Sequence, residues 1–375
     1  MKPYSVNFND ILDKPCAARQ IKDRSIICVC NTTYCDEFTR EKPVKGSYVT
    51  YTSSEAGSRF KKGYGVFHDS GWNPKCCSAS LVVNSKVKYQ VAEGFGGAVT
   101  DAASINWKSL PEVMQQSLID ALYLHACSAR DLLHKLRPLL HPAHSSPADK
   151  EFVHLVLPSS YYSSKGLEYN MIRVPIGGCD FSTHAYAYNE LPENDIDLLN
   201  FNLTSEDFEF KPTSKRRRGS FPWQKLKVDL GSWPRAVTYI SDILEDLNHN
   251  VVGWIDWNLC LNTHGGPNWS ENYVDSPIIV DVIKNEFYKQ PMFYAMGHFS
   301  KFIKRGSRRI EVNEIKRLFS SSVKHVGFLT PDGTVVLVLL NEGEKRIVSV
   351  RCGKKKAVLE LEAKSVTTME FYCVL

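Results

Sequence analysis

Three short apolar segments, each followed by glycine, acidic or aromatic residues, constrain the fold of this chain most strongly. They cover residues 93–101, 168–181 and 251–257, and the third follows a helical pattern that begins at Ser232. Apolar side chains recur along that helix at three- and four-residue spacing, at Val237, Ile240, Leu244 and Leu247. A helix that leads into a strand with polar and aromatic residues at its C-terminal end is typical of a (β/α) barrel. We therefore expect the three segments to be barrel strands.

Strand patterns lie on both sides of this region. Residues 41–92 alternate polar and apolar residues in short runs that are broken by glycines. The C-terminal part contains three more apolar runs with turn signals between them, at 335–340, 346–350 and 366–374. Short strands in this arrangement predict a β-sandwich. Between the two regions, Ser109 and Glu112 predict a capping box that starts a helix.

The composition is that of a globular protein with more than one domain. The chain has 375 residues, of which 43% are hydrophobic and 23% are charged. The net charge of +5 is small and scattered, which suits an anionic lipid surface and argues against a nucleic-acid partner. No stretch approaches the roughly 18 apolar residues of a transmembrane helix. The first 15 residues have no apolar core, so we expect no signal peptide in this chain.

The sequence contains eleven cysteines, and four of them lie close together near its start. These four, Cys16, Cys28, Cys30 and Cys35, favour two small disulfide loops over a zinc knot or free thiols, because they lack paired zinc-ligand spacing. Three glycosylation sequons, at Asn31, Asn202 and Asn268, also favour a secretory route.

Two stretches do not fit the barrel pattern. Residues 123–160 are rich in histidine and proline, and the pair His141 and His144 suggests a metal site. The prolines prevent a helical ligand pair, so a solvated insertion is the better interpretation. The basic run from Lys215 to Arg218 is most simply a solvated loop, with a nuclear signal or a protease site as alternatives.

Several longer motifs, in a constant order, resemble the lysosomal glucosylceramidases of animals. They are the segments 25–36, 94–102, 169–182, 251–258, 265–269, 274–281 and 287–301. The resemblance implies a truncated (β/α)8 barrel of the TIM type with an attached β-sandwich and a small disulfide-bearing sheet. The small sheet would combine residues 1–40 with 258–290, the sandwich 41–92 with 307–375, and the barrel 93–257 with 291–306.

The resemblance also implies a function and a binding site. The family hydrolyses the β-glucosidic bond of glucosylceramide with retention, in the lysosome, without a metal or other cofactor. Its partners would be glucosylceramide, an anionic lipid surface and a saposin-type activator protein. Asp180, Trp257 and Asn272 would contact glucose hydroxyls, Phe181 would line the entrance, and the disulfides would pair Cys16 with Cys28 and Cys30 with Cys35.

The chain departs from the family where the catalytic carboxylates should stand. The family's acid/base glutamate belongs to an Asn-Glu-Pro motif, which does not occur here. Its nucleophile lies four residues before a Gly-Ser pair that matches Gly219 and Ser220, and Lys215 occupies that position. Barrel strands 3 to 7 would then be missing near residues 211–219. Asp101 and Asp256 also stand at strand ends, but the missing strands argue against their replacing the glutamates.

We therefore expect no catalytic residues and no hydrolysis from this chain. The alternatives are an active glucosylceramidase, a glycolipid-binding or partner-binding remnant, and the product of a mis-spliced gene.

Overall fold

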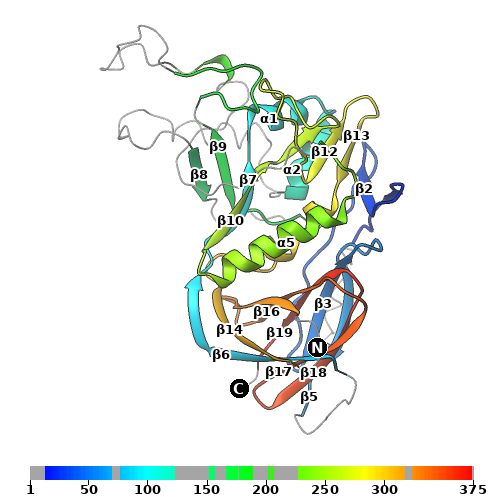
Figure 1. The fold of residues 1–375 in the computed structure, drawn as a ribbon, viewed down its shortest axis with the longest axis vertical. Coiled ribbons are helices and arrows are strands. Elements are labelled where there is room, and N and C mark those ends of the chain that lie inside the picture. The colour runs from blue at the N-terminus through cyan, green and yellow to red at the C-terminus, as the bar shows by residue number, and fades with distance from the viewer. Residues whose placement is uncertain are drawn as a thin grey trace, which may run out of the picture.

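The computed structural model describes residues 13–69, 77–122, 152–156, 166–175, 177–188, 202, 204–206, 227–316 and 323–373. Within these ranges the strands form sheets of five, four and ten strands. Figure 1 shows the four-stranded and ten-stranded sheets at opposite ends of the molecule, with helix α5 between them. No helix in the described ranges is long and apolar enough to cross a membrane.

The four-stranded sheet contains the three predicted barrel strands. Its order is β10-β7-β9-β8, with the bounds Gly253–Asn258, Gly94–Ala98, Met171–Pro175 and Phe152–Val156. β10, β7 and β9 are parallel, as a barrel requires. Glycine is needed where they meet, because a Cβ on Gly96 would lie 1.9 Å from the Met171 carbonyl oxygen. The sheet is open over the described residues, as predicted for a truncated barrel.

The outer strand β8 corrects one prediction. It lies inside the stretch 123–160 that the sequence assigned to a solvated insertion, and it pairs antiparallel with β9. The strand was not predicted from the sequence, because histidine and proline dominate the first part of that stretch and the apolar run 152–156 is short. Antiparallel pairing gives β9 a partner on its outer edge.

Four helices accompany the barrel strands: α1 (Asp101–Lys108), α2 (Glu112–Leu122), α5 (Trp233–Asn248) and α6 (Pro291–Ser300). The sequence correctly placed α5 directly after Ser232 and its buried face at Ile240, Leu244 and Leu247. It wrongly made Ser109 an N-cap. Ser109 is the C-cap of α1, and its hydroxyl donates to the Asn106 carbonyl at 2.6 Å. The unpredicted α1 starts immediately after β7, where the Thr100 side chain caps the Ala103 N–H.

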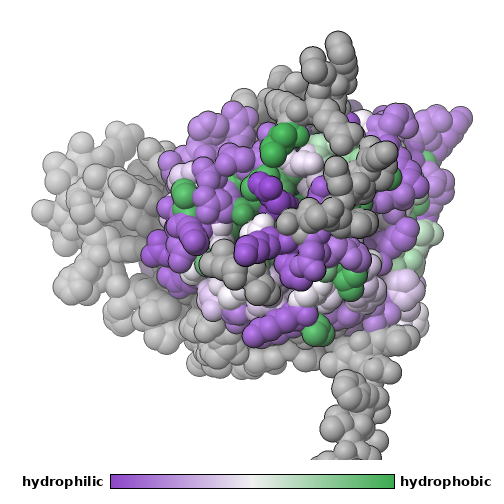
Figure 2. Space-filling view, turned by 90° about the horizontal axis from the view of Figure 1, so that it is seen from below, coloured by the Kyte–Doolittle hydropathy of each residue, from purple (hydrophilic) through white to green (hydrophobic). Residues whose placement is uncertain are grey.

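The ten-stranded sheet forms the predicted sandwich. Its order is β4-β3-β19-β16-β15-β14-β6-β17-β18-β5. β4 and β5 lie at opposite ends of this order although only Phe67 separates them in sequence, so the sheet must fold back on itself. The bounds are β3 Ser47–Ser54, β4 Lys61–Val66, β5 His68–Asp69, β6 Ala79–Val91, β14 Arg308–Lys316, β15 Lys324–Leu329, β16 Val335–Asn341, β17 Arg346–Cys352, β18 Lys355–Leu361 and β19 Ser365–Phe371. The face in Figure 2 is mainly hydrophilic with isolated apolar residues, while β16 is buried along its whole length.

Contacts of His298 and Asn248 help to join the sandwich to the barrel helices. His298 of α6 is fully buried between the hydroxyls of Ser53 and Thr368, at 2.9 and 2.8 Å. Burial lowers the pKa of His298 to about 3, so the ring stays neutral in this contact. At the C-terminal end of α5, the Asn248 amide donates to the His325 carbonyl at 2.9 Å.

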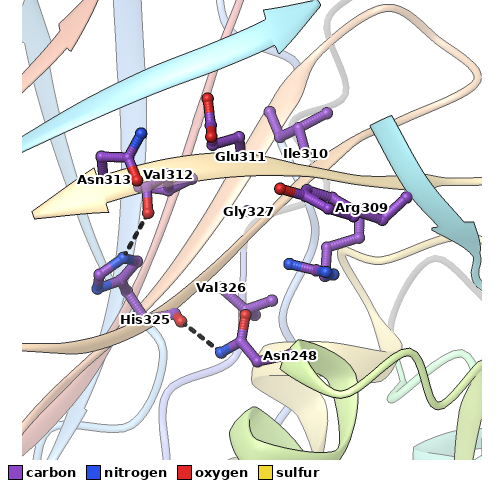
Figure 3. Close-up of a pocket in the computed structure, with 10 residues that line it drawn as sticks. Asn248, Arg309, Ile310, Glu311, Val312, Asn313, His325, Val326 and Gly327 are labelled. Carbon is purple, nitrogen blue, oxygen red and sulfur yellow. Dashed lines mark hydrogen bonds between the residues drawn. The ribbon is translucent and has the colours of Figure 1, made fainter. Parts of the chain in front are cut away.

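A polar pocket of about 220 Å³ lies beside this second contact (Figure 3). Its Arg309 side chain is held over the Tyr89 ring, 3.7 Å from the centroid, and donates to Gln90 at 2.9 Å. None of the predicted substrate-binding residues lines this pocket.

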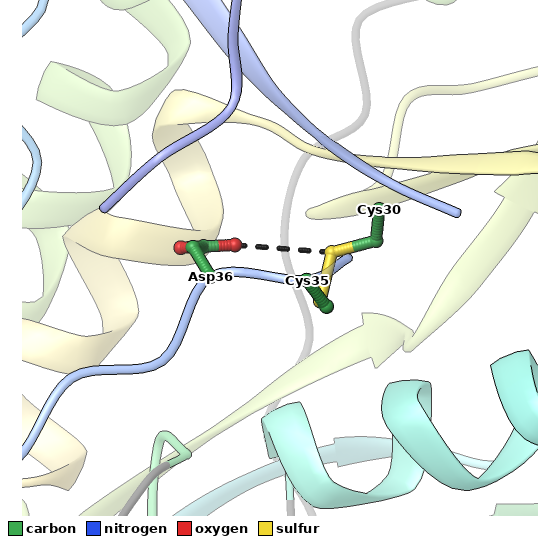
Figure 4. A group of neighbouring side chains, drawn as sticks. All are labelled: Cys30, Cys35 and Asp36. Carbon is green, nitrogen blue, oxygen red and sulfur yellow. Dashed lines mark hydrogen bonds between the residues drawn. A yellow bond between two sulfur atoms is a disulfide. The ribbon is translucent and has the colours of Figure 1, made fainter. Parts of the chain in front are cut away.

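The small sheet contains β1 (Ala18–Gln20), β2 (Ile26–Cys30), β11 (Cys260–Asn262), β12 (Ile278–Asp281) and β13 (Glu286–Lys289), in the order β1-β2-β13-β12-β11. The predicted disulfides Cys16–Cys28 and Cys30–Cys35 are both confirmed. Cys30, Cys35 and Asp36 lie together (Figure 4), but the two sulfurs are bonded to each other and offer no thiolate for zinc.

A third disulfide was not predicted. It joins Cys352, the last residue of β17, to Cys373, two residues after the end of β19. The two residues are 21 positions apart, with Cα atoms 5.8 Å from each other. The bond ties the C-terminal strand to the opposite part of the sandwich sheet.

We expect Cys373→Ala to lower the free energy of unfolding by about 3 kcal/mol, because the open loop gains entropy in the unfolded chain. Urea denaturation measures this loss. The double variant Cys352→Ala/Cys373→Ala should have nearly the same free energy of unfolding as Cys373→Ala, because the single substitution already removes the disulfide. Two free thiols at these positions in non-reduced peptide maps would contradict the assignment.

Candidate functional site

Two of the residues predicted to bind the sugar, Asp180 and Asn272, are in contact although they come from different sheets. Asp180 follows β9, and Asn272 lies in the long loop between β11 and β12, 92 positions later. The Asn272 amide donates to the Asp180 carboxylate at 3.3 Å. Both residues are only partly buried.

The same loop contacts Asp180 a second time. The Trp269 backbone N–H donates to the Asp180 carbonyl at 3.2 Å, and its indole N–H donates to the Cys179 carbonyl at 2.8 Å. Trp269 is 49% exposed, so an aromatic surface stands beside the Asp180–Asn272 pair. No role was predicted for Trp269, although the motif Gly-Gly-Pro-Asn-Trp at 265–269 indicated that the loop carries an aromatic group.

Trp257 of β10 lies next to this group through Phe181. The Phe181 and Trp257 rings meet edge to face, with centroids 6.0 Å apart and planes at 78°. Arg173 of β9, which sequence reasoning missed, holds its guanidinium 4.6 Å from the Trp257 ring centroid. Trp257 is partly exposed, which an indole needs in order to stack on a sugar ring.

Phe181 does not line an entrance, contrary to the prediction. It is 1% exposed and packs in an apolar cluster with Ile27, Val29 and Leu261. Its carbonyl accepts a hydrogen bond from the Ala102 N–H at 2.8 Å, which ties the turn after β9 to the start of α1. Phe181 therefore has a packing role, and the exposed aromatic residues of the neighbouring loop are Trp269 and Tyr273.

Two buried acids, Asp101 and Asp256, belong to the same region of the barrel strands. The Asp101 carboxylate accepts a hydrogen bond from the Tyr186 hydroxyl at 2.9 Å. The Asp256 carboxylate accepts from the Tyr239 hydroxyl at 3.0 Å and from the Trp257 N–H at 2.8 Å. Burial raises the pKa of Asp256 to about 7, against the lowering effect of these two bonds. Asp256 is 5% exposed, and its hydrogen bond from the Trp257 N–H supports the backbone near the end of β10.

The other predicted site residues lie apart from this group or outside the described ranges. Lys215, Gly219 and Ser220 fall in a part of the chain that the structure does not describe. Of the three sequon asparagines, Asn202 is exposed, Asn31 is partly buried, and Asn268 is 7% exposed.

Comparison with known families assigns the barrel and the sandwich. The model of the glycosyl hydrolase family 30 TIM-barrel domain matches residues 146–219 and 213–303, and the model of the glycosyl hydrolase family 30 beta sandwich domain matches residues 306–369. The chain is a glucosylceramidase-like protein of glycosyl hydrolase family 30. The family match begins at residue 146, so the end of the predicted insertion 123–160 belongs with the barrel.

Curated relatives extend over nearly the whole chain. The lysosomal acid glucosylceramidase of Mus musculus is 25% identical and covers 89% of this chain and 90% of its own length. Putative glucosylceramidase 4 of Caenorhabditis elegans is also 25% identical, with 90% of each chain covered. The mouse alignment runs over 512 residues, more than the 375 of this chain, so the relative contains many residues that have no counterpart here.

Solved structures support the same fold at lower identity. SrfJ from Salmonella typhimurium has a TM-score of 0.63 at 16% identity, and covers 87% of this family 30 chain and 99% of its own. The endo-beta1,6-glucanase BT3312 has a TM-score of 0.57 at 13% identity, with the same coverage. These likenesses confirm the barrel-plus-sandwich architecture of the family.

Asp256 should make the stability of this protein depend on pH. Its pKa rises from about 3.9 in the unfolded chain to about 7 in the fold, so the folded state binds one extra proton between these values. The contribution of Asp256 to the free energy of unfolding is therefore fully present below about pH 4. It is lost as the pH rises to about 7, by up to about 4 kcal/mol.

Urea denaturation at pH 4.5 and pH 7.5 measures this dependence. Asp256→Asn should remove much of the difference between the free energies of unfolding at the two pH values, because the amide resembles the protonated acid. The control variant Glu344→Gln, on the surface, should keep that difference. An unchanged difference in Asp256→Asn would show that Asp256 is ionised in the fold.

Proposed function

We propose that this chain is a non-catalytic member of family 30 that binds the sugar of a β-glucosylated lipid such as glucosylceramide. The observation that carries the proposal is the group formed by Asp180, Asn272 and Trp257. Asn272 contacts Asp180, the neighbouring Phe181 contacts the Trp257 ring, and all three side chains of the group remain partly exposed.

The chemistry of the group suits a sugar ring. A carboxylate accepts hydrogen bonds from neighbouring hydroxyls, and Asp180 Oδ1, the oxygen that does not bind Asn272, would take this role. The Asn272 amide adds both a donor and an acceptor. An indole offers the flat apolar surface on which the C–H face of a glucose ring can stack, and Trp257 and Trp269 both provide one.

The sequence argues against hydrolysis. A retaining glycosidase needs two carboxylates about 5–5.5 Å apart, one as acid/base and one as nucleophile. The Asn-Glu-Pro motif of the family's acid/base is missing from the 375 residues, and Lys215 stands at the aligned nucleophile position. A lysine forms no glycosyl ester, and its positive charge opposes an oxocarbenium-like transition state.

The family match supports a missing block at this place. The barrel model matches in two pieces, and these meet at residues 213–219, inside the predicted break. The residues of the mouse relative that have no counterpart in this chain are consistent with such a missing block. Without the strands that would hold the glutamates, the proposed site keeps contacts for the sugar and lacks the groups that cleave its bond.

The proposed setting is the lysosomal lumen, next to an anionic lipid surface and a saposin-type activator. The three disulfides support an oxidising route to that compartment. The net charge of +5 supports attraction to anionic lipid.

A fluorogenic β-glucoside tests both halves of the proposal. We expect the purified chain to release no fluorophore and yet to bind the intact glucoside, as measured by ligand-detected NMR. Asp180→Ala should weaken this binding by about tenfold or more, because a hydrogen bond to a charged group contributes about 1.5–3 kcal/mol. Asp120→Ala, on helix α2, serves as the matched control and should bind like the parent.

Two results would contradict the proposal. Turnover that Asp180→Ala abolishes would show that a substitute catalytic pair exists. Equal affinity of the parent and Asp180→Ala would show that the predicted sugar contacts do not form the binding site.

A further inference from the structure

The loop between β11 and β12 is organised around one buried side chain, that of Asn268. Its amide oxygen accepts three hydrogen bonds: from the Ser270 N–H at 2.9 Å, the Ser270 hydroxyl at 2.9 Å and the Asn272 N–H at 3.1 Å. Its amide nitrogen donates to the Asn272 carbonyl at 3.0 Å. One side chain therefore holds both backbone polar groups of Asn272.

This arrangement fixes a turn that would otherwise be unfavourable. Between the two asparagines, Glu271 has a φ of +58°, in the left-handed region that costs a side-chain-bearing residue roughly 1 kcal/mol or more. The hydrogen bonds of Asn268 offset that cost. They thereby aim the Asn272 amide at the Asp180 carboxylate, 3.3 Å away.

We infer that Asn268 is a positioning residue for the sugar contact Asn272, and that it carries no glycan although it begins an Asn-Trp-Ser sequon. N-glycans attach to the amide nitrogen of asparagine. In Asn268 that nitrogen donates a hydrogen bond to the Asn272 carbonyl, and the residue is only 7% exposed. A glycan there would remove a donor hydrogen and would require the loop to open.

Asn31 provides an internal comparison. Its amide oxygen accepts the same kind of bonds, from the Thr33 N–H and the Thr33 hydroxyl, both at 2.9 Å. Within the part of the chain that the structure describes, its amide nitrogen makes no hydrogen bond to the backbone, and the residue is only partly buried. Asn202 is exposed. The sequons at Asn31 and Asn202 are therefore compatible with a glycan in the fold, and the third is not.

The role of Asn272 as a sugar contact rests on the proposed function, whereas the glycan and loop predictions do not. The first measurement is glycopeptide mass spectrometry of the full chain from a eukaryotic secretory host. We expect occupancy at Asn31 and Asn202 and none at Asn268. A glycan at Asn268 in the folded protein would overturn the inference.

The second measurement is amide hydrogen exchange of the Asn272 N–H. We compare Asn268→Ala, which removes the acceptor, with Ser270→Ala, which removes the sequon and leaves Asn268 in place. Exchange at Asn272 should become about tenfold faster in Asn268→Ala, as expected for the loss of about 1.4 kcal/mol, and should stay near the parent rate in Ser270→Ala. Equal rates in the parent and Asn268→Ala would overturn the positioning role.

The third measurement is a double-mutant cycle on binding of the fluorogenic β-glucoside. Asn268→Ala and Asn272→Ala should each weaken binding by about tenfold, and the double variant should be no weaker than either, because one acts through the other. Fully additive losses would overturn the inference. If the parent itself does not bind, the proposed function fails, and the exchange and glycan results still decide the role of Asn268.

Discussion

The close approach of three parallel strands is the constraint on which the rest of this structure depends. β10, β7 and β9 come from residues near 255, 96 and 173, and they pack backbone against backbone. A Cβ on Gly253 would lie 2.4 Å from the Gly94 carbonyl oxygen, so glycine permits this contact. Because parallel strands end at the same edge, the residues that follow them meet there. Asp180 and Trp257 owe their proximity to this pairing.

Contacts with the small sheet and the sandwich stabilise the few barrel strands. In the small sheet, buried Asp36 lies 2.9 Å from the Lys289 ammonium and accepts a hydrogen bond from Tyr294 of α6 at 2.6 Å. Such a buried pair is strongly destabilising to break, since it leaves one charge without its partner. On the other side, neutral His298 joins α6 to the sandwich. α6 thus connects both accessory sheets to the three parallel strands.

Sequence reasoning succeeded where the signal was a local pattern or a long motif. The apolar run of β9, the apolar face of α5 and the pairing of Cys30 with Cys35 are of this kind. It failed where spatial neighbours decided the outcome. Ser109 has the sequence of an N-cap, but α1 already ends at that residue and uses its hydroxyl. Cys352 and Cys373 meet because the sandwich sheet folds back, and no spacing in the sequence indicates this.

The same contrast holds at the candidate site: motifs indicated residues, whereas burial and hydrogen bonding depended on packing. The motifs, through the family resemblance, indicated Asp180, Trp257 and Asn272 as sugar contacts, which stays a prediction, although Asn272 does contact Asp180. They did not indicate that Phe181 is buried or that Asn268 uses its amide nitrogen within the loop. Burial and hydrogen bonding of a single side chain depend on residues that are far away in sequence, such as Ile27 and Leu261 beneath Phe181.

The central claim is that the sugar contacts remain while the nucleophilic carboxylate is gone. Intact-mass spectrometry after incubation with 2-deoxy-2-fluoro-β-glucosyl fluoride tests it most directly. In a retaining glycosidase the nucleophile displaces fluoride and keeps the fluorosugar as a stable ester, so the protein gains the mass of one sugar. We expect the mass of this chain to stay unchanged while a family relative with both glutamates is labelled. A stoichiometric adduct on an aspartate or glutamate of this chain would contradict the account.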